Sequence, residues 1–112
     1  MSKIFKEFLF LKRKGVYEKV AISNIMFLQV SGDYVSCCLK TEELFTIRVS
    51  LNKLSELLTP HDFMRIHRSY LVQLSFIESI NFQEDFVIIG KNQIPMNRDS
   101  KKRLGQLITK LE

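Results

Sequence analysis

Short apolar segments alternate with turn-forming residues through the first half of the chain. Aliphatic, aromatic and β-branched residues dominate five stretches, at 5–12, 16–22, 26–30, 34–40 and 44–49. Gly15, Gly32 and small polar residues stand between these stretches, and such residues favour reversal of the chain. Ser23 and Asn24 are suited to cap a single helical turn. The region is therefore predicted to form about five short strands, with the first two paired as a hairpin.

The apolar spacing changes to that of a helix between Ser50 and Leu58. The recurring apolar positions are Leu51, Leu54, Leu57 and Leu58. Ser50 precedes them as a candidate N-cap, and Pro60 lies just beyond the end. This pattern predicts a short amphipathic helix laid on the sheet, with its leucines in the core. We expect Leu54 and Leu57 to be buried beneath it.

Strand patterns return after this helix and give way to a final helix. Apolar runs favour a strand with a bend at 63–74 and shorter strands at 77–82, 86–89 and 93–96. Pro95 suits the edge or end of a strand because it has no amide hydrogen to donate. Residues 99–111 are predicted to be helical, with one apolar stripe formed by Leu104, Leu107, Ile108 and Leu111.

Composition is that of one soluble globular domain spanning residues 1–112. The chain is 46% hydrophobic and 26% charged, and its formal net charge is +5, which favours an anionic partner such as nucleic acid. Cys37 and Cys38 are adjacent, so a disulfide between them would be strained, and two ligands alone do not form a zinc site. We expect both thiols to be reduced, which is typical of a cytoplasmic protein. The sequence has no long apolar run and no signal-like N-terminus, so we expect no membrane span.

A polar block interrupts the apolar stretch FMRIHRSYLVQL at 63–74. It consists of Arg65, His67, Arg68 and Ser69. In an extended chain, alternate side chains share a face, and unpaired Arg is almost never fully buried, so the block must turn outward at an edge. Arg offers a planar fork of donors that fits phosphate or the edge of guanine. The pattern predicts an anion-facing surface; the alternative is a basic sheet edge that only prevents pairing with other sheets.

A second polar group precedes the final helix. Asn97 is placed to cap that helix, and Asp99 lies in its first turn. Arg98 is harder to explain structurally, because a cation near a helix N-terminus is unfavourable toward the helix dipole. We expect Arg98 to reach outside the fold. Lys101 extends the same basic patch, as either a phosphate contact or an ordinary solvated charge.

Together these segments resemble the LytTR family of DNA-binding domains. The resemblance rests on FMRIHRSYLVQLSFIESI, on IPMNR about a dozen residues later, and on NIMFLQVSGDYVSCCL and VSLNKLSELL earlier in the chain. It implies an elongated, mainly β fold of small antiparallel sheets with a short mid-chain helix and a C-terminal helix. It also implies a bacterial transcription regulator of the response-regulator type, in two-component systems, whose loops enter successive major grooves of double-stranded DNA.

The resemblance also implies which residues meet DNA. The expected DNA-binding residues are Asp33, Tyr34, Arg65, His67, Arg68, Ser69, Asn97, Arg98 and Lys101. The acidic Asp33 argues against phosphate contact at its own loop. The chain departs from the family pattern at Gln73, where Asn is usual, and at Asn97, where Ser is frequent. A change of base preference is one consequence of the second departure, since Asn can pair with adenine.

Partners follow from the same resemblance. We expect two copies to bind paired repeat sites, and a receiver domain or a separate regulator to control the domain. No metal or cofactor is expected. An enzyme is disfavoured because His67 and Ser69 have no orienting carboxylate or Gly-rich loop in the sequence pattern. The stronger alternative is a basic β-domain that binds RNA or a protein through the same face, although its Phe residues alternate as core rather than as an exposed stacking surface.

Overall fold

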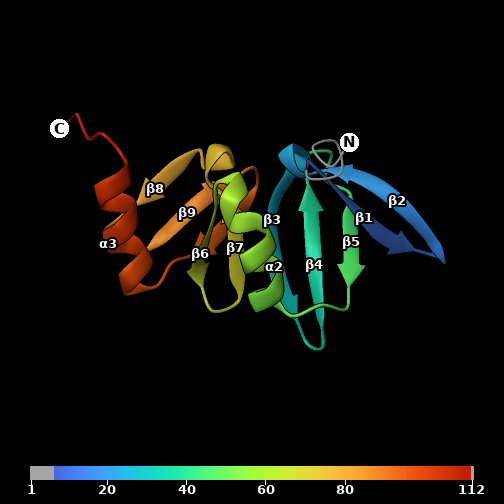
Figure 1. Ribbon diagram of the computed structural model, residues 1–112. Coiled ribbons are helices and arrows are strands. Elements are labelled where there is room, and N and C mark those ends of the chain that lie inside the picture. Colours follow the sequence, from blue (N-terminus) through green and yellow to red (C-terminus); the bar gives the residue numbers. More distant parts are fainter. Residues whose placement is uncertain (1–6, 112) are drawn as a thin grey trace.

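Three antiparallel sheets lie in a row in the computed structural model, which describes residues 7–111 (Figure 1). The two-stranded sheet pairs β1 (Phe8–Arg13) with β2 (Val16–Ala21). The central sheet has the order β5-β4-β3-β7-β6, and the third sheet has the order β10-β9-β8. The extents of 48 × 33 × 24 Å show an elongated molecule, so the predicted elongated, mainly β fold is confirmed.

The remaining strand and helix bounds follow the chain. They are β3 (Ile25–Ser31), β4 (Tyr34–Leu39), β5 (Leu44–Ile47), α2 (Leu51–Leu58), β6 (Phe63–His67), β7 (Tyr70–Gln73), β8 (Ser79–Asn81), β9 (Phe86–Ile89), β10 (Asn92–Pro95) and α3 (Arg98–Leu107). Short 3-10 turns occupy η1 (Ile22–Asn24), η2 (Thr59–His61) and η3 (Leu74–Phe76). The single turn expected near Ser23 is present, but Ser23 and Asn24 lie inside it, and no side chain caps it.

The central sheet is covered on both faces, which explains the continuous apolar run of β3. Leu28 packs in one core, with α2 and residues of the N-terminal hairpin. Phe27 packs in a second core, with the third sheet and α3. A strand buried on both sides needs apolar residues at successive positions rather than alternating ones. The two cores are therefore separated by a single layer of sheet.

Helix α2 begins as the sequence predicted, but one of its leucines does not lie where we expected. The Ser50 hydroxyl accepts a hydrogen bond from the Lys53 backbone N–H, which confirms the N-cap. Leu54 and Leu58 are buried, whereas 52% of Leu57 is exposed, so the predicted burial of Leu57 is wrong. Adjacent helical residues are separated by about 100°, so Leu57 points away from the sheet when Leu58 points into it.

The C-terminal helix is shorter than its apolar stripe suggested. Helix α3 ends at Leu107, and the following residue is already extended. Only Leu104 of the stripe is buried; the exposed members are Leu107, Ile108 and Leu111. Beyond the helix, Lys110 lies with its Nζ 4.7 Å from the ring centroid of Phe82. A helix end without an apolar partner is marginally stable, so the chain leaves the helix once the core is covered.

Both cysteines are free, as the sequence predicted. Cys37 is buried on β4, and burial raises the pKa of its thiol to about 12. The thiol therefore stays protonated and acts as a small apolar core residue. Within residues 7–111, no helix is both long and apolar enough to cross a membrane.

Candidate nucleic-acid interface

The polar block of the sequence forms the turn of the β6–β7 hairpin. Strand β6 ends at His67, the chain reverses through Arg68 and Ser69, and β7 returns from Tyr70. Ile66 is fully buried, and it anchors the hairpin in the second core. The outward turn that the sequence predicted is therefore present, but it reverses the chain, so 63–74 forms two paired strands instead of the single bent strand that we expected.

Arg65 fixes this turn through hydrogen bonds to its backbone. Its guanidinium donates hydrogen bonds to the backbone carbonyls of His67 (3.1 Å, from Nε) and Arg68, and to Oδ1 of Asn52 (2.8 Å). Asn52 lies on α2, so the side chain also ties the hairpin to the start of that helix. Bonds from a charged donor are stronger than those between neutral groups. The donors of Arg65 are thus largely engaged within the domain.

His67 and Ser69 close the turn through the backbone. The Ser69 backbone N–H donates to Nδ1 of His67 at 3.1 Å, and the imidazole meets the Tyr70 ring edge-on at 5.8 Å between centroids. A neutral imidazole that accepts at Nδ1 carries its proton on Nε2. His67 therefore has a donor at Nε2, and the nitrogen facing Ser69 bonds the amide rather than activating the hydroxyl.

Arg68 occupies the tip of the hairpin with its side chain exposed. Within residues 7–111, its guanidinium forms neither an ion pair nor a hydrogen bond, although its own carbonyl is held by Arg65. A fixed backbone with an uncommitted guanidinium is the arrangement expected for binding an external anion or base edge.

The start of α3 docks on the same hairpin. The Asn97 backbone N–H donates to the Ile66 carbonyl at 2.8 Å, and the Ser100 hydroxyl donates to the Arg65 carbonyl at 3.0 Å. Asn97 also caps α3, because its Oδ1 accepts from the Ser100 backbone N–H at 2.8 Å. The cap prediction is confirmed. Arg98 follows directly and is exposed, so α3 presents it beside the hairpin turn.

Lys101 has a partner inside the domain. Its Nζ lies 2.8 Å from Oδ1 of Asp85, and both side chains are partly exposed. Exposed ion pairs of this kind contribute little to stability, typically less than about 1 kcal/mol. Lys101 can therefore exchange this partner for a phosphate at small cost, and its expected phosphate contact stays a prediction.

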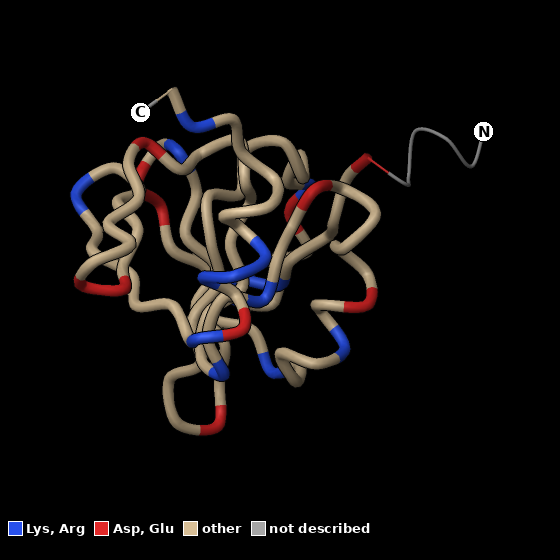
Figure 2. Tube along the Cα trace, turned by 90° about the vertical axis from the view of Figure 1, so that its left-hand side faces the viewer, with Lys and Arg blue, Asp and Glu red and all other residues tan. Residues whose placement is uncertain are grey.

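The β3–β4 turn completes the surface. The Val30 backbone N–H donates to the Ser69 carbonyl at 2.9 Å, which places this turn beside the β6–β7 turn. Asp33 and Tyr34 are exposed there, and Gly32 at the tip has a φ of +62°. The turns of both hairpins and the start of α3 lie along the lower edge of the molecule in Figure 1. Figure 2 shows Lys and Arg positions crowded in the centre and lower part of the domain.

Two residues of this region were not predicted from the sequence. Arg48 places its guanidinium carbon 5.2 Å from the ring centroid of Tyr34. The signal lies in the strand register, since β4 and β5 pair Val35 with Ile47 and thereby set Tyr34 opposite Arg48. Asn52, the partner of Arg65, could not be found in this way because it lies on a helix.

Comparison with known proteins identifies the family of the chain. A family model of the LytTr DNA-binding domain matches residues 15–109. The chain belongs to the LytTr DNA-binding domain family. A solved structure of a LytTr DNA-binding domain from Bacillus cereus, part of a protein described as a methyl-accepting/DNA response regulator, has the same fold. Its TM-score is 0.77 at 21% sequence identity, and the match covers 90% of this chain and 95% of that chain.

Family membership makes this LytTr domain a DNA-binding module of a transcription regulator. The departure at Gln73 has a local explanation. Gln73 is buried, and its Nε2 donates to the backbone carbonyls of Ile25 at 2.7 Å and Ile22 at 3.2 Å. Its amide thus joins β7 to the start of β3.

Proposed function

We propose that this LytTr domain recognises a specific sequence in double-stranded DNA, with the β3–β4 turn, the β6–β7 turn and the start of α3 entering neighbouring major grooves. The observation that carries the proposal is the uncommitted guanidinium of Arg68 on a turn fixed by Arg65. A base reader must reach a hydrogen-bonding edge in the groove from a defined position. A fixed turn supplies that position without an ordering cost on binding.

The contacts of each side chain suggest its role on DNA. We assign base reading to Arg68 and Arg98, the two exposed guanidinium groups on separate segments. Arg65 acts by positioning the turn, because its donors are engaged within the domain. Asn97 contributes an amide N–H only, since its Oδ1 caps α3 and the paired contact that reads adenine needs both atoms.

The other site residues extend the surface. His67 offers Nε2–H, while Ser69 and Lys101 are suited to phosphate, which fixes the protein on the duplex without reading sequence. Tyr34 approaches DNA from the β3–β4 turn, where the carboxylate of Asp33 disfavours a phosphate contact.

Assembly and cellular context complete the proposal. Two copies occupy paired repeat sites, and a receiver domain or a separate regulator controls them. The protein works in the cytoplasm and binds rather than catalyses. The geometry supports this last point, because Nδ1 of His67 is held by the Ser69 amide instead of facing the Ser69 hydroxyl.

The test compares Arg68→Ala and Arg98→Ala on two duplexes, one selected from a random pool and one scrambled. For a base reader, affinity for the selected duplex should fall by at least about tenfold more than affinity for the scramble, which corresponds to about 1.4 kcal/mol. Loss of a phosphate contact would instead weaken both duplexes alike. Fluorescence anisotropy at fixed salt measures both affinities, because binding to DNA depends steeply on ionic strength.

Lys91→Ala provides the matched control. Lys91 forms an ion pair with Glu42, which lies on the β4–β5 turn at the opposite end of β4 from Tyr34, and 87% of the Lys91 side chain is exposed. The substitution also removes one positive charge, but from the far edge of the domain, so the affinities for both duplexes should stay within about twofold. Equal losses on both duplexes for Arg68→Ala and Arg98→Ala would leave only a basic patch. Tighter binding of single-stranded RNA of equal length would favour the RNA-binding alternative.

A further inference from the structure

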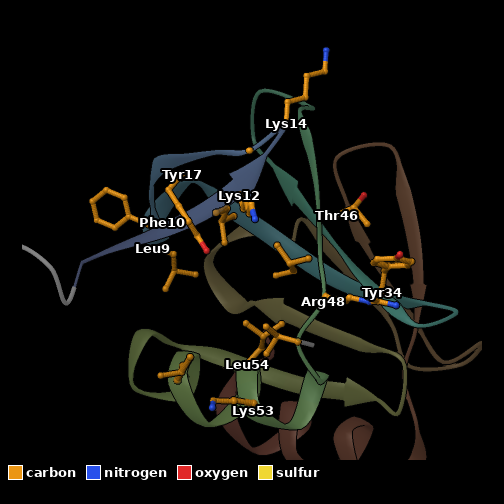
Figure 3. A pocket seen from close by; sticks show the side chains of 15 residues that line it. Leu9, Phe10, Lys12, Lys14, Tyr17, Tyr34, Thr46, Arg48, Lys53 and Leu54 are labelled. Atoms are coloured by element: carbon orange, nitrogen blue, oxygen red, sulfur yellow. The ribbon is translucent and has the colours of Figure 1, made fainter.

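An open groove lies between the N-terminal hairpin, β5 and α2, and it reaches the proposed DNA-binding surface at Tyr34. Figure 3 shows the side chains that line it, and its volume is about 590 Å³. Pockets for small organic ligands commonly have volumes of about 300–1,000 Å³ and mostly apolar walls. The groove therefore has the size of a small-molecule site.

The walls of the groove are unusually apolar for an exposed surface. Ten large apolar side chains are exposed within residues 7–111, and half of them line this groove. These are Phe10, Tyr17, Tyr34, Val49 and Leu57. Isolated exposed apolar side chains are ordinary, but a contiguous group of them marks a binding surface. The exposure of Leu57, unexpected from the helical pattern, is part of this group.

Positive charge surrounds the same opening. The basic residues of the lining are Lys12, Lys14, Arg48 and Lys53, and the lining contains no Asp or Glu. In Figure 3, Lys12, Arg48 and Lys53 lie on different sides of the opening, whereas Lys14 extends away from it. None of these four residues forms an ion pair with another part of the chain that the structure describes. Unpaired cations at an apolar cavity raise the local concentration of anions.

We propose that this groove binds an organic anion that combines an apolar body with one acidic group, such as a carboxylate or sulfonate. The body packs on Leu54, Leu57 and the aromatic rings, and the acidic group pairs with Lys53, Lys12 or Arg48. The size of the cavity and the absence of acidic lining residues favour such a ligand over a neutral or cationic one.

Tyr34 belongs to both the groove and the β3–β4 turn. A ligand that reaches Tyr34 therefore contacts a residue of the proposed DNA-binding surface. This consequence rests on the proposed function, whereas binding of the anion does not. The experiment accordingly uses the full chain without DNA, so that its failure and a failure of DNA recognition are separate results.

The probes are 8-anilinonaphthalene-1-sulfonate, followed by its fluorescence, and decanoate, followed by displacement of that dye and by calorimetry. We expect saturable binding at one site per chain. Acetate has the acidic group without the body, and decylamine has the same body with the opposite charge. Both should bind at least about tenfold more weakly than decanoate, because acetate lacks the apolar body and decylamine lacks the acidic group. Equal binding of decanoate and decylamine would overturn the proposal.

Two variants locate the site. Leu57→Glu places a carboxylate in the groove at an exposed position and should weaken binding of both probes by at least about tenfold. Lys53→Gln should weaken them about threefold or more. The matched controls are Leu107→Glu, an exposed leucine on α3, and Lys91→Gln, an exposed lysine at the far edge, and both should bind normally. Circular dichroism verifies the fold of every variant. Unchanged binding in both groove variants, or no saturable binding to the unmodified chain, would refute the site.

Discussion

The two hairpins at the lower edge of this LytTr domain are built differently. The β6–β7 turn is held by the guanidinium of Arg65 and by the imidazole of His67. The neighbouring β3–β4 turn has no side-chain hydrogen bond of this kind within residues 7–111; it has a glycine tip and the contact of Arg48 with the Tyr34 ring. A backbone hydrogen bond from the Val30 N–H to the Ser69 carbonyl joins the two turns.

This difference separates two ways of presenting a side chain to DNA. A turn fixed by charged hydrogen bonds presents Arg68 in one arrangement, which suits the reading of one base edge. A turn held only by its strands can adapt to the local shape of the groove. We therefore expect the β6–β7 turn to carry base discrimination and the β3–β4 turn to adjust affinity. Three changes test this contrast, in order of decreasing effect.

The largest effect should come from the core beneath the fixed turn. Ile66→Ala removes a fully buried side chain and should lower the free energy of unfolding by about 2–5 kcal/mol. Tyr34→Ala, at a position that is 43% exposed on the other hairpin, should change it by less than about 0.5 kcal/mol. Urea denaturation measures both. Similar losses of unfolding free energy in the two variants would show that the two hairpins are anchored equally.

An intermediate effect should come from the clamp itself. Arg65→Met keeps much of the apolar stem but removes the hydrogen bonds to His67, Arg68 and Asn52, and should destabilise the domain by about 1–3 kcal/mol. Amide exchange of Ser69 should accelerate at the same time. Arg48→Met on the other hairpin loses only a ring contact, so its stability should change by less than about 1 kcal/mol.

If Arg65 positions the turn, Arg65→Met should also reduce discrimination between the selected and scrambled duplexes. A purely phosphate-binding Arg65 would instead lower both affinities equally and leave the amide exchange of Ser69 unchanged. The two readouts together decide between positioning and direct contact.

The smallest effect should come from the charge on the adaptable turn. Asp33→Asn removes a carboxylate from a surface that faces DNA, and should raise affinity for both duplexes by about twofold to fivefold, because like charges repel. The increase should shrink at high salt, where exposed charges are screened. A loss of affinity confined to the selected duplex would show that the Asp33 carboxylate reads a base.

Local features of the fold could be predicted well from the sequence. Ser50 and Asn97 cap their helices as expected, because a cap depends only on residues within one helical turn. The turn at Gly32 follows from the conformational freedom of glycine. The outward turn at Arg68 could be foreseen because apolar residues flank the polar block around it and the unpaired guanidinium has to remain in solvent.

Features that depend on distant partners could not be predicted in this way. Leu57 has the helical spacing of a core residue, yet it is exposed because no element within residues 7–111 buries that side of α2. The apolar stripe beyond Leu104 likewise stays exposed, and α3 ends early. Lys101 looked free in the sequence, but the antiparallel third sheet brings Asp85 to it.

By itself, the sequence determined most of the strands, the presence of the two helices, their N-caps and the basic residues that must stay in solvent, since these follow from propensity and from the cost of burying charge. Only the tertiary structure decided which of those basic residues have hydrogen-bond partners within the domain. Arg65 and Arg68 are close in sequence and chemically identical, but packing of α2 and the reversal of the hairpin give the first three acceptors and leave the second in solvent. Hydrogen-bond partners are set by distances in space, and the spacing of residues along the chain does not encode those distances.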